Sequence, residues 1–143
     1  MVSGETEAFR LSNTLVNLRE RFTHWCYPVV TANTPRSRKS KGAKFQNEIR
    51  DLLLEKFSDQ LEPDDIKTAV MGESGTDIKL SPAAQKLFQF AVEAKRCEKI
   101  ALRQWWKQAK ENSNDKLKPL VITKQNREEA LVILSLQDFL DLL

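Results

Sequence analysis

Two short strand patterns near the middle of the chain constrain its fold most strongly. The second pattern, residues 88–95, alternates an apolar set of side chains with a largely polar set, which is the period of a strand with one covered face. This period puts Glu93 and Lys95 on the same face, about 7 Å apart along the strand. The first pattern, residues 75–80, carries Asp77. If the two strands are neighbours, Asp77 lies beside Glu93.

A short helix is predicted between these two strands. Ser81 fits the position before the first turn, where its hydroxyl can accept a hydrogen bond from a free backbone N–H. Pro82 fits the first turn itself, where a missing N–H costs nothing. Residues 83–87 then continue the helix. The link is therefore a short helical crossover.

Two carboxylates and an ammonium group at one point of a fold need an explanation. Like charges at close range oppose ionisation unless a cation is present. Mg²⁺ is typically held by one or two carboxylates, together with waters and phosphate oxygens of a substrate. A neighbouring ammonium group can then orient a water and stabilise charge that builds on a phosphate. Asp77 and Glu93 are therefore candidate ligands of Mg²⁺ or Mn²⁺, and Lys95 is a candidate catalytic residue.

This arrangement resembles the PD-(D/E)XK nuclease superfamily, in which an Asp is followed further along the chain by Glu-x-Lys. The matching residues here are Asp77 and Glu93-Ala94-Lys95, and Thr76 stands where the family has a proline. The resemblance implies an α/β fold with a restriction-endonuclease-like core, that is, a central mixed β-sheet flanked by helices. It also implies that Asp77, Glu93 and the Ala94 carbonyl hold the metal, while Lys95 assists the attacking water.

Two further segments carry the resemblance. Residues 71–82 are similar to small phage nucleases, in which Met-Gly-x-x-Gly-x-Asp-Ile leads into Leu-Ser-Pro. Residues 42–57 have apolar side chains at helical spacing and resemble the first helix of archaeal-type Holliday-junction resolvases. The carboxylate of that helix falls at Gln46 here, and Glu48 follows two residues later. Both are candidate site residues, Gln46 by holding a metal-bound water.

A helix is also predicted after Glu-x-Lys, over residues 99–111. In the family, a Gln on this helix points back to the site. Gln108 fits that position best, and Gln104, one turn earlier, is the alternative. Arg103 and Lys107 share one face of the helix and are candidate DNA contacts.

Positive charge is concentrated in residues 35–44, where five residues are basic and none is acidic. Such a run is typically solvated and mobile, and it suits phosphate contacts that do not read sequence. A linker or a processing signal is the alternative. Gly72 and Gly75 bracket Ser74 and permit a close approach of backbone to phosphate. The candidate DNA contacts in these segments are Arg36, Arg38, Lys39, Lys41, Lys44 and Ser74.

The rest of the chain completes one nuclease core with an extension before it. We expect an extra N-terminal helix over residues 3–24, because apolar side chains recur there at helical spacing. The predicted parts are an N-terminal helical extension (1–34), the basic segment (35–44) and the nuclease core (41–143). The remaining core elements are strands over 67–71, 117–123 and 130–134 and a closing helix over 136–143.

Composition excludes several classes of protein. No apolar run approaches the roughly 18 residues that a membrane span needs. The first ten residues contain two glutamates and no apolar core, so we expect no signal peptide. Two cysteines are too few for a disulfide framework. We therefore expect a cytoplasmic protein of a bacterial or phage-infected host cell, without a membrane contact.

These patterns together favour a metal-dependent endodeoxyribonuclease. Structure-specific cutting, like that of a Holliday-junction resolvase, is the preferred form. The alternatives are a sequence-specific homing or phage endonuclease of the same fold, and a non-catalytic DNA-binding module. A chain of 143 residues with one metal site would cut two strands as a homodimer related by a twofold axis.

Overall fold

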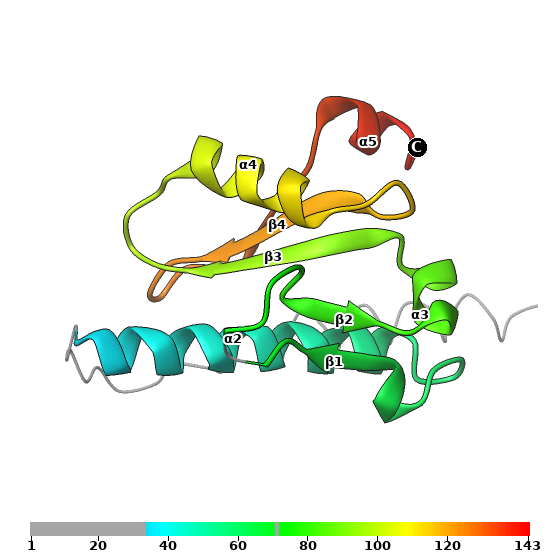
Figure 1. Ribbon diagram of the computed structural model, residues 1–143, viewed down its shortest axis with the longest axis horizontal. Helices are drawn as coiled ribbons and strands as arrows, with labels where there is room; N and C mark the ends of the chain where they lie inside the picture. The colour runs from blue at the N-terminus through cyan, green and yellow to red at the C-terminus, as the bar shows by residue number, and fades with distance from the viewer. Residues whose placement is uncertain (1–33, 71) are drawn as a thin grey trace, which may run out of the picture. The chain divides into compact units, whose positions relative to one another are not determined.

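The computed structural model describes residues 34–70 and 72–143. Figure 1 shows their helices and strands along the chain. Their order is α2 (Pro35–Lys56), η1 (Pro63–Asp65), β1 (Ile66–Thr68), β2 (Ile78–Leu80), α3 (Pro82–Leu87), β3 (Phe90–Arg96), α4 (Leu102–Asn112), β4 (Lys118–Lys124), β5 (Leu131–Ile133) and α5 (Leu136–Leu140). The predicted helix over residues 3–24 lies outside the described residues, so the 1–34 extension stays a prediction.

The strands form two small sheets. In the first, β3 runs parallel to β4, and β4 runs antiparallel to β5, so this three-stranded sheet is mixed. In the second, β1 and β2 form an antiparallel pair. The α/β class is as predicted, but the expected single central sheet is divided. The reason lies at Asp77: its backbone N–H bonds to the Val92 carbonyl at 2.9 Å, and its side chain then takes the next free N–H of β3.

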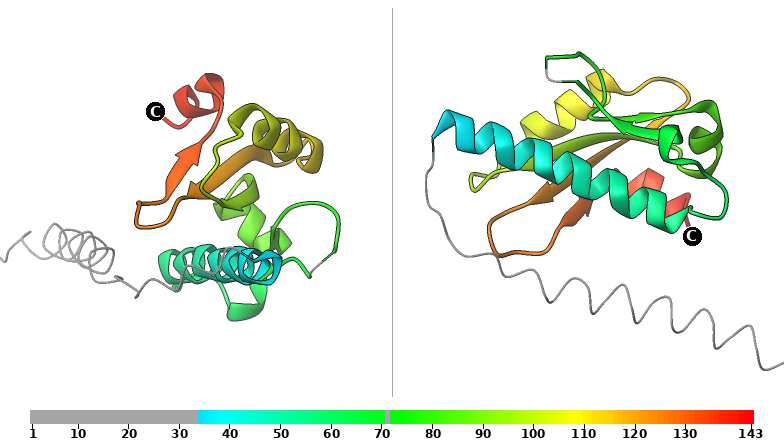
Figure 2. Two further views of the ribbon diagram at one scale, coloured as in Figure 1. Left: turned by 90° about the vertical axis from the view of Figure 1, so that its left-hand side faces the viewer. Right: turned by 90° about the horizontal axis from the view of Figure 1, so that it is seen from below.

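Both faces of the three-stranded sheet are covered. On one face, Phe45 and Ile49 of α2 pack with Val92 and Leu120. On the other face, α4 packs through Trp105 and Ala109 against Val121. Figure 2 shows α2 and α4 on opposite sides of the sheet.

The prediction that β3 has one covered face is therefore wrong. Parallel strands need a crossover connection, and α4 is that connection between β3 and β4. It packs on the face that carries Ala91 and Glu93, each only 2% exposed. Ala91 is small and apolar and fits under α4, and the polar Glu93 on the same face is buried only with its partners Lys95 and Asn112.

The basic segment is helical, which corrects the prediction of a mobile run. Helix α2 begins at Pro35, and the Thr34 hydroxyl accepts a hydrogen bond from the Ser37 N–H at 3.2 Å. A capping Thr followed by Pro in the first turn is a strong start signal for a helix. The glycine at position 42 is accommodated inside α2, at a cost of about 1 kcal/mol relative to Ala.

The other elements agree with the predicted ones apart from their ends. The crossover helix α3 has its predicted cap, because the Ser81 hydroxyl accepts from the Ala84 N–H at 3.1 Å. Strands β1 and β5 are shorter than predicted, and α5 ends at Leu140 rather than at the last residue. Within the described parts of the chain, no helix is both long and apolar enough to cross a bilayer.

Candidate active site

Asp77 lies at the free edge of β3, directly before β2 begins. Its Oδ2 accepts a hydrogen bond from the Ala94 N–H at 2.7 Å, and its Oδ1 accepts one from Gln46 Nε2 at 2.7 Å. In the turn that leads into Asp77, Gly75 has a backbone φ of +104°, which residues other than glycine rarely adopt. The strand edge, helix α2 and this turn together hold the carboxylate in one orientation.

Glu93 and Lys95 lie on the face of β3 that α4 covers. Lys95 Nζ is 2.6 Å from Glu93 Oε1, and the Glu93 side chain is 3% exposed. Lys95 Nζ also donates to Gln108 Oε1 of α4 at 2.9 Å. The second oxygen of Glu93, Oε2, accepts from Asn112 Nδ2 at 3.0 Å. The strand period thus brings the predicted pair together, and α4 contributes one amide to each member.

Burial is the main influence on the Asp77 carboxyl. It raises the pKa of Asp77 above its usual value, and the negative charge of Glu93 raises it further. The Ala94 N–H, the Lys95 ammonium and the Gln46 amide act in the opposite direction. The net effect is an increase, so the ionised site carries negative charge that these donors do not fully balance.

The chemistry of these donors fits a hard divalent cation. The charge of Glu93 raises the pKa of Asp77, so the two carboxylates repel each other, and a bound cation would relieve that repulsion. Ala94 donates its N–H to Asp77, and the carbonyl of the same strand residue points to the same edge. Within residues 34–70 and 72–143, no three His, Cys, Asp or Glu side chains gather as a larger ligand set. Mg²⁺ and Mn²⁺ accept such a sparse set because waters complete their shell.

Of the two predicted polar residues of α2, Gln46 contacts the site and Glu48 contacts another part of the fold. Gln46 and Glu48 are two positions apart in the helix, so their side chains point about 200° apart and flank its buried face on opposite sides. Glu48 Oε1 lies 2.7 Å from Lys124 Nζ at the end of β4, with both side chains less than a fifth exposed. The structure therefore brings Gln46, and not Glu48, to Asp77.

Gln108 is the member of its predicted pair that reaches the site, through Lys95. Gln104 is exposed on α4. Arg103 and Lys107 lie on another side of the same helix, where they line a hollow with Trp106 and with residues 133–135. The structure does not bring these two basic residues into contact with Asp77 or Glu93.

The predicted DNA contacts of α2 surround its first half. Four of them are exposed and Lys41 is half-buried. Lys39 stands seven residues, about two turns, before Gln46, so the two side chains lie along one side of the helix. Ser74 lies in an exposed turn, where its carbonyl accepts from Lys79 Nζ at 3.4 Å. The exposed basic residues of α2 are Arg36, Arg38, Lys39 and Lys44.

Sequence reasoning missed two polar residues. Asn112 contacts Glu93, and Lys124 pairs with Glu48. Asn112 lies in a polar run at the end of a helix, where nothing distinguishes it from Asn114. The sequence pattern predicts Lys124 as the first residue of a turn. Both contacts depend on how helices dock on the sheet, which no local pattern reveals.

Comparison with known proteins adds one positive finding. A family model described as "Phage putative PDDEXK endonuclease" matches residues 37–142, and these include every residue of the Asp77 site. No curated protein and no solved structure matched the chain. Because the matching region is most of the chain, the protein belongs to the phage PDDEXK endonuclease family, and so to the PD-(D/E)XK nuclease superfamily.

Proposed function

We propose that this protein is a metal-dependent endonuclease that hydrolyses phosphodiester bonds of DNA. The observation that carries the proposal is the hydrogen bond from the Ala94 N–H to Asp77, which places this carboxylate at the strand residue between the paired Glu93 and Lys95. The match to an endonuclease family supports it. Mg²⁺ or Mn²⁺ would be held by Asp77, Glu93 and the Ala94 carbonyl.

Each residue of the site has a distinct role in this proposal. Asp77 is kept in place by the Ala94 N–H and by Gln46, so its charge stays at the strand edge. Lys95, steadied by Glu93 and Gln108, orients the attacking water and stabilises charge on the phosphate. When bound, the divalent ion supplies Lewis-acid activation of water and of the phosphate. Glu48 supports the site only indirectly, by holding α2 to β4.

The decisive assay is cleavage of DNA by the purified protein with Mg²⁺ or Mn²⁺. Asp77→Ala, Glu93→Ala and Lys95→Ala should each reduce cutting by at least about 100-fold, because each removes charge that acts on the transition state. Circular dichroism should show a retained fold. Asp115→Ala, which changes an exposed carboxylate, serves as the matched control. Near wild-type cutting by Asp77→Ala would overturn the site.

A non-catalytic DNA-binding module is the alternative from another class. It would bind DNA in the same assay and cut none of it with any divalent ion. The paired carboxylates and lysine argue against this alternative, because binding alone does not require a buried Glu93. Binding without cutting would establish it.

Branched DNA recognised by shape is the substrate that we propose. The basic side chains of α2 surround an exposed half-helix, which suits contacts with several phosphates rather than base edges in one groove. A mobile four-way junction and linear duplexes of the same sequence should therefore be compared. Paired symmetric nicks in the junction support resolution. Equal or better cutting of one linear sequence would favour a homing-type endonuclease.

A homodimer follows from the same proposal. The described chain has one Asp77 site, and paired cuts need two such sites related by symmetry. Within the described residues, exposed apolar side chains are frequent on β5 and α5, among them Leu131, Val132 and Leu136. That surface is the first place to test by sedimentation of a Leu131→Asp variant. Such an enzyme would act in the cytoplasm of a bacterial or phage-infected cell, where DNA is accessible.

A further inference from the structure

Helix α4 ends with three neighbouring polar residues that have different tasks. Ser113 ends the helix: its N–H bonds to the Ala109 carbonyl at 3.0 Å, and its hydroxyl donates to the Lys110 carbonyl at 2.8 Å. Asn114 shapes the next turn, because its Oδ1 accepts from the backbone N–H groups of Lys116 and Leu117. Asn112 differs from both, because its side chain makes a long-range contact.

That contact is with Glu93, nineteen residues earlier. Asn112 Nδ2 donates to Glu93 Oε2 at 3.0 Å, and Lys95 Nζ lies 2.6 Å from the other oxygen, Oε1. Both oxygens of a carboxylate that is 2% exposed are therefore engaged by different groups. Because Ser113 and Asn114 already satisfy the helix end and the turn, neither requires the Asn112 amide.

The position of α4 makes this contact specific. Trp105 and Ala109 are buried against the sheet, which sets the rotation of the helix. Gln108 and Asn112 are four residues apart and so lie one above the other on one side of it. Glu93 and Lys95 have the matching spacing on β3, and each receives one of the two amides.

We propose that Asn112 is a positioning residue for Glu93. Its amide donates a hydrogen bond to Oε2 and fixes the side chain of Glu93. Oε1 is then the oxygen that lies beside Lys95 and is available to a divalent cation. The inference rests on the proposed metal-dependent function and adds a residue to it. Groups that orient a ligand in this way typically change metal affinity by about 10- to 100-fold when they are removed.

The test is a titration of the metal-free protein with Mn²⁺, in which electron paramagnetic resonance measures the concentration of free ion and so gives the Kd. Asn112→Ala should raise the Kd for Mn²⁺ by about 10-fold or more at a temperature where circular dichroism shows it folded. Its thermal midpoint without metal should also fall, because Glu93 Oε2 loses a buried partner. Asn112→Gln, which keeps an amide on a longer side chain, should recover part of the affinity.

Asn114→Ala is the matched control, because it removes turn hydrogen bonds rather than the Glu93 contact. It should lower the thermal midpoint and leave the Kd for Mn²⁺ within about twofold of the wild-type value. Wild-type binding that Asn112→Ala leaves unchanged would overturn the positioning role alone. A wild-type protein that binds no Mn²⁺ would overturn the proposed function, and this inference with it.

Discussion

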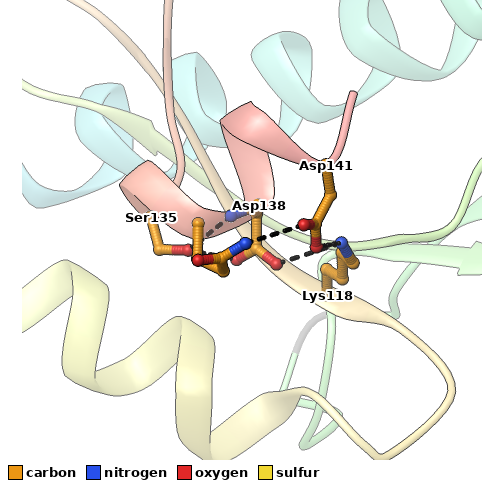
Figure 3. A network of polar contacts seen from close by, with 5 residues as sticks. Lys118, Ser135, Asp138 and Asp141 are labelled. Atoms are coloured by element: carbon orange, nitrogen blue, oxygen red, sulfur yellow. Dashed lines mark hydrogen bonds and ion pairs between the residues drawn. The ribbon is translucent and has the colours of Figure 1, made fainter. Parts of the chain in front are cut away.

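Two clusters in this chain each combine one lysine with two carboxylates, and they differ in burial. In the first, Lys95 and Glu93 are 22% and 3% exposed as side chains, and Asp77 lies beside them. In the second, Lys118 of β4 lies 2.6 Å from Asp141 and 3.3 Å from Asp138, at the end of α5 and within it. Figure 3 shows the second cluster. Its lysine is 35% exposed, and Asp141 is 46% exposed.

The pKa of Asp77 in the first cluster and the pKa of Asp141 in the second shift in opposite directions. Burial raises the pKa of Asp77 despite a nearby ammonium group. The hydrogen bond from Lys118 lowers the pKa of Asp141, which water also reaches. In the second cluster the hydrogen bonds to Asp141 outweigh burial, so its ionised form is favoured. In the first, burial outweighs the donors around Asp77, so its ionised form is disfavoured, and a bound cation would offset this. Residue types alone do not distinguish a candidate active site from a surface ion pair.

The largest expected difference is in DNA cutting. Asp77→Asn keeps the shape of the side chain and removes its charge, so cutting should fall by at least about 100-fold. Asp141→Asn makes the same chemical change in the second cluster and should leave the rate within about twofold of the wild type. Initial rates on one DNA substrate measure both. A comparable loss in both variants would mean that the clusters are not functionally distinct.

Stabilisation by metal should separate the clusters next. Ions that bind only the folded state raise the free energy of unfolding by about 2.7 kcal/mol at 100 times the Kd. Thermal unfolding with and without Mn²⁺ should show this increase for the wild type and for Asp141→Asn, and chelation should reverse it. Asp77→Asn and Glu93→Gln should show little increase. Stabilisation that survives both substitutions would locate the ion elsewhere.

The basic side chains in the first half of α2 provide a third group for the comparison. Replacing Arg36, Arg38, Lys39 and Lys41 with Ala should weaken binding about equally for all DNA sequences. Each lost phosphate contact should also reduce the slope of log K against log salt by about 0.9. Fluorescence anisotropy at several salt concentrations measures the slope. Lys86→Ala, an exposed lysine on α3, is the control. An unchanged slope would show that these side chains do not contact phosphate.

The smallest expected effects are on stability as pH changes in metal-free protein. The folded pKa of Asp77 is raised, so relative to Asp77→Asn the wild type loses stability as pH rises from about 3.9 through that pKa. The folded pKa of Asp141 is lowered, so its contribution is present above about 3.9 and is lost as pH falls through the folded value.

The lysine of the second cluster defines the upper end of the same window. The pKa of Lys118 is raised by Asp141, so its contribution is present below about 10.4 and is lost as pH rises through the folded value. Thermal midpoints of Lys118→Met against the wild type should therefore differ most near neutral pH, and high salt should reduce the difference. A difference that is independent of pH and salt would indicate lost packing instead of lost charge.

Local patterns predicted that Glu93 and Lys95 lie on the same face of one strand. Glu93 and Lys95 face the same way because a strand repeats every two residues, and this spacing allows their long side chains to form the 2.6 Å contact. Ser81 caps α3 as expected, because capping involves only neighbouring backbone groups. Thr34 and Pro35 carried a similar signal for the start of α2, and the charge of the following residues obscured it.

Tertiary structure decided the rest of the site. Gln46 reaches Asp77 and Glu48 reaches Lys124 because Phe45 and Ile49 are buried, and that burial sets the rotation of α2 on the sheet. Asn112 reaches Glu93 because the docking of α4 through Trp105 brings residues nineteen positions apart together. The sequence identified Asp77 as a candidate metal ligand, but the raised pKa of Asp77 comes from burial, which only packing creates. The sequence by itself thus determined the identity and local spacing of the charged groups. Packing decided their partners and raised the pKa of Asp77, because the burial of apolar side chains sets the orientation of whole helices on the sheet.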